Sequence, residues 1–345
     1  MKDYKVTIGI PVYNVKKYIR LSLDSALAQT FENIEFLILD DCGIDGSMDI
    51  VREYQNTHPR GKDIRIVRQP QNGGLGCARN RIIEEARGKY LYHLDADDSI
   101  APNTIELLYD NAQRYDADIV FSSFQKVEEF GTEVKKIDFR YTDAVFLKEN
   151  EFADTVYSDY GFLQASTCNF LIKREIYIKN HIRHKAINYW EDFTTTMDLP
   201  TYVTRVVMLS NVTYFYYCRN GSMSNYSKRN HIDKDEVQKT IDAMALVKQA
   251  SNRIKDKPYF HKRMYKVMLT HFYMVATILK NEDVIIPPFT KKEIRDVMLS
   301  PLSFSDVLCL KGWRFKNLML YFLGILPPSV SVLIIRLMGE IKGLI

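Results

Sequence analysis

The stretch Lys89-Tyr90-Leu91-Tyr92-His93-Leu94-Asp95-Ala96-Asp97-Asp98 is the most informative part of the sequence. It runs from an alternating, aromatic-rich segment, typical of a β-strand, directly into three carboxylates within four positions. Neighbouring carboxylates repel one another, so such a cluster is either fully solvated or bound to a divalent cation. Ser99 and Pro102 follow the cluster, and an acidic turn without a metal is therefore the plain alternative.

Three further strand-and-turn units precede this stretch, in the order expected for a parallel sheet covered by helices. The predicted strands are Val6 to Pro11, Ile34 to Leu39 and Ile64 to Val67. A helix is predicted from about Val15 to Thr30, where apolar residues recur at helical spacing, and Asn72-Gly73-Gly74 leads into another helix. Polar residues thus follow the carboxyl ends of several strands, which is where open α/β sheets bind ligands.

Five motifs resemble, in order and spacing, those of the family 2 glycosyltransferases of the GT-A fold. They are Pro11-Val12-Tyr13-Asn14, Asp40-Asp41 with Asp45-Gly46-Ser47, Asn72-Gly73-Gly74 with Ala78-Arg79-Asn80, Gly88-Lys89-Tyr90, and Asp95-Ala96-Asp97-Asp98. The resemblance covers roughly the first two-thirds of the chain. It implies an α/β fold with a Rossmann-like, mostly parallel sheet, helices on both faces and a helical C-terminal region. The chain departs from the family pattern where Cys42, Gly43 and Ile44 follow the acidic pair.

The residue chemistry by itself also suits a nucleotide sugar. A uracil ring needs an acid to accept its N–H and a flat surface against which the ring can pack. Asp41 and Tyr13, backed by Pro11, supply this combination. The alternative is that Tyr13 is a core aromatic residue and Asp41 caps a helix.

The resemblance implies roles for the remaining donor-site residues. A diphosphate carries charge that Mn²⁺ or Mg²⁺ held by oxygen ligands neutralises, and Asp97, together with Asp95, would bind this metal. Asp95 would also reach the ribose hydroxyls, and Asp98 would orient the sugar or the groups behind it. Further nucleotide-sugar contacts are expected from the motif residues Asn14, Asp40, Gly73, Arg79 and Ala96. Arg79 would assist the phosphates or the sugar, and the alternative is an ordinary salt-bridged arginine.

An inverting transfer needs a base that removes the proton of the acceptor hydroxyl as this hydroxyl attacks the anomeric carbon. Tyr189-Trp190-Glu191-Asp192-Phe193 resembles the acidic pair of the family, in which the second acid usually serves as base. We favour Asp192 over Glu191, because adjacent acids at a helix start point in different directions. The alternative is that both acids merely begin a helix, where the helix dipole favours them.

A second loop is expected to contact the donor. The segment Tyr214 to Ser224 resembles the closing strand and loop of the family. Arg219 and Ser222 would help to hold the diphosphate when the loop closes. The aromatic residues that precede them are more typical of packing than of recognition.

Length and composition suit a two-part enzyme. A chain of 345 residues can bury a substantial core, and we predict a glycosyltransferase domain over 1–226 and a helical region over 227–345. Within the first part, 1–125 would bind the nucleotide sugar and 126–226 would supply the acceptor side and the base. The five cysteines are scattered, which argues for free thiols in a reducing cytoplasm and against a zinc site. No signal-peptide core precedes the first strand, which also favours a cytoplasmic location.

The net charge of +4 hides an asymmetry between the two parts. Residues 227–345 contain 20 Lys and Arg against 11 Asp and Glu, whereas the preceding residues contain 27 against 32. Two apolar segments, Leu318 to Leu326 and Val330 to Met338, are separated by Pro327-Pro328 and flanked by basic residues. This pattern favours an interfacial helix pair on the anionic inner face of the cell membrane. The alternatives are a membrane-spanning segment over Asn317 to Ile335 and a helical hairpin packed on the enzyme itself.

These observations, with the resemblance, predict an inverting, metal-dependent glycosyltransferase. It would move a sugar from a nucleotide diphosphate sugar, expected to be a UDP-sugar, to a hydroxyl of a glycan or lipid-linked acceptor, as in surface polysaccharide synthesis. Nucleotidyl transfer is one alternative, but it usually needs a Gly-rich, basic loop directly after the first strand. A non-catalytic nucleotide-sugar binding protein is another, and the presence of both Asp97 and Asp192 argues against it. Nucleic acid is not an expected partner, since no basic stripe is interleaved with stacking aromatic residues.

Overall fold

The computed structural model describes residues 3–130, 133–159, 163, 166–187, 190–218, 230–310 and 313–345. The contacts of the chain divide it into two compact units. The N-terminal unit holds the described residues up to 152, together with 166–186 and 191–218. The C-terminal unit holds 153–159, 163, 187, 190 and the described residues from 230 onward. The division predicted at residue 226 falls in 219–229, outside the described residues.

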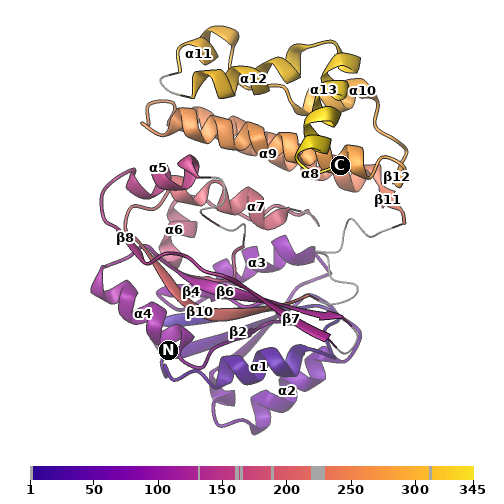
Figure 1. Ribbon diagram of the computed structural model, residues 1–345. Helices are drawn as coiled ribbons and strands as arrows, with labels where there is room; N and C mark the ends of the chain where they lie inside the picture. Colours follow the sequence, from indigo (N-terminus) through magenta and orange to yellow (C-terminus); the bar gives the residue numbers. More distant parts are fainter. Residues whose placement is uncertain are drawn as a thin grey trace. The chain divides into compact units, whose positions relative to one another are not determined.

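Ten strands of the described chain join in one sheet, in the order β3-β2-β1-β4-β9-β6-β10-β5, with β7 beside β6 and β8 beside β10 (Figure 1). They are β1 (Val6–Val12), β2 (Ile34–Asp40), β3 (Ile64–Arg68), β4 (Tyr90–His93), β5 (Ser99–Ile100), β6 (Ile119–Phe130), β7 (Glu133–Phe139), β8 (Ala144–Phe146), β9 (Phe170–Lys173) and β10 (Val206–Cys218). Strands β1 to β4 are mutually parallel, and β10 is parallel to β6. Strand β9 lies antiparallel between β4 and β6. The α/β architecture is therefore the predicted one.

Each of the first three strands ends one residue later than predicted, so that Val12, Asp40 and Arg68 are their last residues. The apolar runs locate these strands well because both faces of the parallel part are covered by helices. Every residue of β1 and of β2 is buried. Their carboxyl ends meet at one edge of the sheet, which places the turns that follow them side by side.

Helices cover both faces of this sheet, as Figure 1 shows for α1 and α2 on one side and α3 on the other. The helices of the N-terminal unit are α1 (Ile19–Leu27), α2 (Ser47–Thr57), α3 (Gly74–Glu85), α4 (Thr104–Arg114), α6 (Arg174–Lys179) and α7 (Glu191–Thr196). Alternate β1 residues, such as Ile8 and Ile10, belong to one core with α1, α2 and α4. Gly9 points the other way, toward Ile82 of α3, whose Cγ2 would lie 2.3 Å from a Cβ at this position.

The helix predicted from Val15 to Thr30 is shorter at both ends in the structure. The backbone N–H groups of Val15 and Lys16 donate to Ser47 Oγ (3.0 Å) and Asp45 Oδ2 (2.7 Å) in the turn after β2. At the other end, the N–H of Thr30 donates to the carbonyl of Pro102 at 2.9 Å. These long-range bonds compete with the helical ones, and local periodicity gives no sign of them.

The C-terminal unit is helical and is built around α9. Its helices are most of α5 (Glu151–Ser158), α8 (Lys234–Ala250), α9 (Phe260–Lys280), α10 (Lys291–Val297), α11 (Phe304–Leu308), α12 (Arg314–Ile325) and α13 (Pro328–Ile341), with the short strands β11 (Ile232–Asp233) and β12 (Ile285–Ile286). Helices α12 and α13 both pack on α9. No helix within the described ranges is long and apolar enough to cross a membrane. Residues 317–335, over which the alternative placed a membrane span, do not form one helix, because α12 ends at Ile325 and α13 begins at Pro328.

Candidate active site

The turns after β1 and β2 are joined through Asn14. This residue has a left-handed backbone (φ 51°), and its side-chain Oδ1 accepts a hydrogen bond from the N–H of Ile44 at 2.9 Å. A Cβ at Gly43 would lie 2.8 Å from the backbone nitrogen of Asn14, so only glycine allows this approach. The Cys42-Gly43-Ile44 departure from the family pattern is thus built into the contact between the two turns. Beside it, Tyr13 is 48% exposed, which rules out the alternative of a core aromatic residue.

Both carboxylates of the acidic pair at the end of β2, Asp40 and Asp41, accept hydrogen bonds from backbone N–H groups. Asp41 is buried and accepts hydrogen bonds from the N–H groups of Gly73 (2.9 Å) and Gly74 (3.1 Å), at the start of α3. Burial raises the pKa of Asp41, and the two amides act against this shift. Asp40 accepts from the N–H of Cys42 at 3.0 Å. Asp41 therefore anchors the start of α3 rather than that of α2. Its contact with uracil stays a prediction. Pro11 is buried within β1, and its packing behind the uracil ring also stays a prediction.

The acidic turn after β4 separates into a solvent-facing part and a buried part. Asp95 and Asp97 are half-buried, and Ala96 between them is buried. Asp98 is almost fully buried and accepts from the Tyr214 hydroxyl (2.5 Å) and the Tyr217 N–H (2.9 Å) of β10. Burial, with the neighbouring carboxylates, raises the pKa of Asp98 well above its usual value. Asp98 thus holds the turn from behind, whereas the side chains of Asp95 and Asp97 are half-buried in front of it.

Arg79 of α3 joins the acidic turn to the candidate base. Its side chain is only 1% exposed, and its Nη2 donates to Asp95 Oδ1 at 2.9 Å. Its Nη1 donates to both Glu191 oxygens at 2.8 Å and, in a very short contact, to Asp192 Oδ1. A buried guanidinium needs such paired carboxylates to compensate its desolvation. Arg79 therefore forms salt bridges, as the alternative interpretation expected. The carboxylates that it binds are themselves candidate site residues.

Arg79 can reach Glu191 and Asp192 because the backbone of α3 lies close to the segment that precedes α7. Helix α3 lies so near the segment before α7 that a Cβ at Gly76 would be 2.1 Å from the carbonyl oxygen of Lys185. The side chain of Asn80, one turn farther along α3, exchanges two hydrogen bonds with the backbone of His184, at 2.8 and 2.9 Å. Gly76 and Asn80 therefore fix the distance between α3 and the segment that carries the acids.

Glu191 and Asp192 both reach Arg79 Nη1 from the start of α7, so the predicted divergence of the two side chains is not seen, but they differ in exposure. Glu191 is buried, and its oxygens are taken by Arg79 and by His184 Nδ1, which lies 2.9 Å away. The Asp192 side chain is 28% exposed and also accepts a hydrogen bond from Thr167 Oγ1 at 2.9 Å. Burial raises the pKa of Asp192 to about 7; Arg79 lowers it and Glu191 raises it. A carboxylate that titrates near neutral pH and reaches solvent suits a general base.

His184, Glu191 and Asp192 also bring their ligand atoms within 4.8 Å of one another. Arg79 donates to both of these carboxylates, so a cation already occupies the place between them. Burial lowers the pKa of His184 to about 3, which leaves the imidazole neutral. We therefore assign this cluster to the support of the base and not to a metal. His184 and Thr167 were missed in the sequence because neither lies within a motif and both meet their partners only through folding.

Three predicted residues lie outside the described part of the chain. They are Tyr189 of the acidic motif and Arg219 and Ser222 of the expected loop. Their roles stay predictions.

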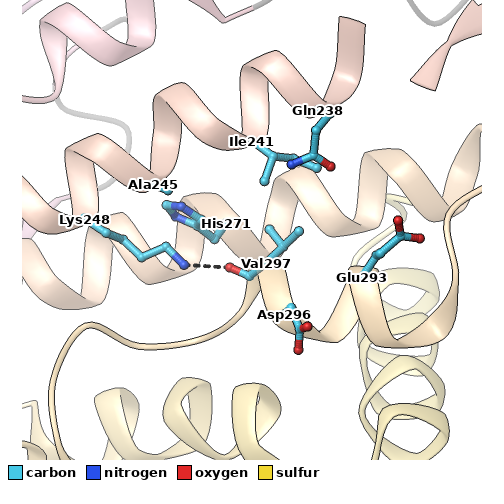
Figure 2. Close-up of a pocket in the computed structure, with 8 residues that line it drawn as sticks. All are labelled: Gln238, Ile241, Ala245, Lys248, His271, Glu293, Asp296 and Val297. Carbon is cyan, nitrogen blue, oxygen red and sulfur yellow. Dashed lines mark hydrogen bonds between the residues drawn. The ribbon is translucent and has the colours of Figure 1, made fainter. Parts of the chain in front are cut away.

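A separate cavity of about 210 Å³ lies in the C-terminal unit, between α8, α9 and α10 (Figure 2). Its lining residues are Gln238, Ile241, Ala245, Lys248, His271, Glu293, Asp296 and Val297. The Lys248 ammonium group donates to the carbonyl oxygens of Val297 (2.6 Å) and Leu299 (2.8 Å), just where α10 ends. Burial lowers the pKa of Lys248 to about 7. The lysine thus caps a helix end, and the cavity holds none of the motif residues, so we do not assign the active site to it.

Comparison with known proteins identifies the family. The model of glycosyl transferase family 2 matches residues 7–180. A cholesterol galactosyltransferase from Borreliella burgdorferi is 28% identical over 284 residues, which cover 79% of this chain and 77% of the relative. The uncharacterized glycosyltransferase YibD from Escherichia coli is 25% identical over 335 residues, covering 90% and 92% of the two chains.

Solved structures show the same fold. S. aureus TarS 1-349 in complex with UDP-GlcNAc has a TM-score of 0.58 at 17% identity and covers 98% of this chain and 92% of its own. The mannosyltransferase PcManGT from Pyrobaculum calidifontis, in complex with GDP-Man and Mn²⁺, has a TM-score of 0.52 at 15% identity, with 97% and 88% covered. These likenesses confirm the GT-A fold that the motifs predicted. The chain therefore belongs to glycosyl transferase family 2.

Proposed function

We propose that this glycosyltransferase is an inverting, metal-dependent enzyme that transfers a sugar from a UDP-sugar to a hydroxyl of a glycan or lipid-linked acceptor. The observation that carries the proposal is that one buried guanidinium, that of Arg79, contacts both the acidic turn at Asp95 and the candidate base Asp192. Donor-side and acceptor-side chemistry are thereby brought to one place. Relatives whose names include a cholesterol galactosyltransferase and a teichuronic acid biosynthesis glycosyltransferase support a role in building surface glycans.

A divalent cation fits the acidic turn. Asp95 and Asp97 are half-buried carboxylates at a strand end, and carboxylate oxygens are the ligands that Mg²⁺ and Mn²⁺ prefer. Arg79 supplies one positive charge, whereas Asp95, Glu191 and Asp192 around it supply up to three negative charges. A nucleotide diphosphate would add more negative charge, so binding needs a further cation. When bound, Mn²⁺ or Mg²⁺ would neutralise the diphosphate as it leaves.

The protein's own groups divide the remaining work. Tyr13 and Asn14, with the buried Asp40 and Asp41 behind them, would form the nucleoside side, and Arg219 and Ser222 would close over the diphosphate. Asp192 would take the proton of the acceptor hydroxyl while the hydroxyl oxygen attacks the anomeric carbon on the face opposite the diphosphate. Glu191 would hold Arg79, which in turn orients Asp192. The sugar–phosphate bond breaks, and UDP departs with the electron pair.

Product analysis tests this function directly. The full-length protein would be incubated with a panel of UDP- and GDP-sugars, with a bacterial lipid extract as acceptor, and the products analysed by mass spectrometry. We expect one nucleotide sugar to give a product heavier than the acceptor by one sugar residue, and EDTA to stop its formation. A product that carries a nucleoside monophosphate would instead indicate nucleotidyl transfer. Binding of UDP-sugar without any product from any acceptor would indicate a non-catalytic protein. The cytoplasmic location is also a proposal, and fractionation of cells would test it.

A further inference from the structure

We propose that helices α12 and α13 dock this enzyme on an anionic lipid bilayer. This inference rests on the proposed function, because a lipid-linked acceptor is presented at such a surface. It concerns a different part of the molecule from the acidic turn, so that it can be tested separately from glycosyl transfer.

The first observation is an exposed apolar stripe on the two helices. The stripe consists of Phe315, Met319, Phe322 and Ile325 on α12 and Val330, Leu333, Leu337 and Ile341 on α13. These residues recur at intervals of three or four, so they share one side of each helix. Phe315 is 81% exposed and Ile341 is 86% exposed. Water-soluble proteins rarely leave such rows of large apolar side chains uncovered, so the stripe indicates a partner.

The second observation is that the internal packing of the unit is already complete without the stripe. Leu320 and Leu323 of α12 and Val332 and Ile335 of α13 are buried. Both helices pack on α9, and α13 also packs on α10. Each helix is therefore apolar on two sides, with one side used inside the unit and the other turned away from it. A helix that is apolar all round needs a second apolar surrounding.

The third observation is the sign of the charges beside the stripe. Arg314 and Lys316, both exposed, flank Phe315, and α12 contains no acidic residue. Exposed Lys342 follows Ile341, and Glu340 is the acid closest to it in sequence. The Lys316 ammonium group lies 4.1 Å from the ring centre of Trp313, an aromatic residue of the type found at membrane interfaces.

These charges decide which occupant the stripe would accept. A second copy of the chain would bring the same positive charges to the contact, whereas an anionic bilayer supplies the opposite charge. Helices of this kind lie in the plane of the interface, with the apolar side chains among the acyl chains and the basic groups among the headgroups. The whole region from residue 227, with 20 basic against 11 acidic residues, adds attraction over a longer range.

Substitution tests this proposal better than deletion, because removing α12 and α13 would uncover the buried Leu320 and Ile335. In one variant, Phe315, Leu333, Leu337 and Ile341 would each be replaced by serine. In a second variant, Arg314, Lys316 and Lys342 would each be replaced by glutamine. The control is Leu246→Ser, which replaces an apolar residue on α8 of the same unit whose side chain is 47% exposed. Each full-length protein would be floated with vesicles of phosphatidylglycerol and phosphatidylcholine, or of phosphatidylcholine alone, at low and high salt.

We expect the wild type and Leu246→Ser to float with the anionic vesicles at low salt. The serine variant should lose at least about tenfold in partitioning. The glutamine variant should lose about 100-fold on anionic vesicles at low salt, and much less at high salt, where charge is screened. Circular dichroism and hydrolysis of the UDP-sugar in solution should be unchanged in all variants, which separates docking from catalysis.

Two results would overturn the proposal. One is a wild-type protein that is active on a soluble acceptor but stays unbound with anionic vesicles at low salt. The other is light scattering that shows a dimer for the wild type and a monomer for the serine variant, with no vesicle binding by either. The second result would assign the stripe to a contact between two copies of the chain. Neither result would touch the assignment of glycosyl transfer.

Discussion

Charged side chains are usually exposed and large apolar ones are usually buried. The acidic turn and the C-terminal helices depart from this rule in opposite ways. In the N-terminal unit a charged side chain, Arg79, is 1% exposed and surrounded by carboxylates. In the C-terminal unit a large apolar side chain, Phe315, is 81% exposed. Buried charges and exposed apolar rows both cost stability, so each is expected where a ligand or partner compensates for it. The contrast supports the proposal that the two units meet different partners: an anionic, polar donor in one and an apolar, anionic surface in the other.

The largest effect should follow the loss of Asp97. Asp97→Ala removes a ligand of the proposed cation, so turnover should fall below detection and UDP binding should lose its dependence on Mn²⁺. Calorimetry with and without the ion measures this. Asp110→Ala, at an exposed position on α4, is the matched control and should change neither quantity. Equal affinity of the wild type for UDP with and without Mn²⁺ or Mg²⁺ would remove the metal from the proposal.

The next effect concerns the choice between the two acids of α7. Asp192→Asn keeps the size of the side chain but cannot accept a proton, so the transfer rate should fall by roughly 10² to 10⁴ while donor binding persists. Glu191→Gln should cost less in rate, because its oxygens hold Arg79 and His184 and do not face solvent. Single-turnover kinetics would distinguish them. A near-normal rate for Asp192→Asn, together with an inactive Glu191→Gln, would reverse the two roles.

Arg79 allows the cost of the buried charges to be measured. Arg79→Met leaves Asp95, Glu191 and Asp192 without their cation, and the free energy of unfolding should fall by about 3–5 kcal/mol at pH 8. The loss should shrink toward pH 5, because the unpaired carboxylates then take up protons in the folded state. Arg81→Met, on the same helix but with a side chain 45% exposed, should cost less than about 1 kcal/mol. Urea unfolding measures both values. A similar decrease in the free energy of unfolding for the two variants would show that the buried charges stabilise the fold no more than an exposed ion pair does.

These contacts also show where inference from sequence ends. The first three strands were predicted to within one residue, because burial of β1 and β2 on both faces leaves continuous apolar runs, whereas β6 to β9 were not predicted. The acids at 95, 97 and 192 were singled out because they stand in motifs, and their roles stay predictions. The partners of Arg79 could not be found that way, since Glu191 lies 112 positions along the chain and reaches α3 only through folding. The tyrosines that bind Asp98 belong to β10, and no local pattern connects them with the acidic turn. Sequence patterns thus single out candidate reactive groups, but they identify only in part the residues that hold these groups in place.

A smaller effect should appear in the dependence of the rate on pH. Burial raises the pKa of Asp192 to about 7, and only the deprotonated carboxylate can act as base. The value of kcat/KM should therefore fall as the pH drops below about 7, by about tenfold per pH unit. Thr167→Val removes a hydrogen bond to the ionised carboxylate, so the pKa should rise and the fall should begin at higher pH. A profile that stays flat down to pH 5 would contradict the assignment of Asp192.

The smallest effect is expected for the exposed apolar stripe of α12 and α13. Phe315→Ser should change the free energy of unfolding by less than about 0.5 kcal/mol, because this side chain is already in water. Leu320→Ala, on the buried side of the same helix, should cost about 2–5 kcal/mol. Thermal unfolding of the two variants in the absence of lipid makes this comparison. A large loss for Phe315→Ser would mean that the stripe is covered within the protein.

The near-contact at Gly76 has a consequence for how variants of this enzyme would be interpreted. Any side chain at this position must push α3 away from Lys185, and it would shift the Arg79 guanidinium, which the same helix carries. A saturation library selected for activity should therefore reject nearly every substitution at position 76, even though glycine has no side chain with which to bind a reactant. Such a position would be mistaken for a binding residue in a map of tolerated changes. Intolerance at Gly76 would instead report the spacing between a helix and a loop. Because a Cβ at position 76 would meet backbone atoms of Lys185 and Ala186, a shorter side chain at a neighbouring position would not restore activity.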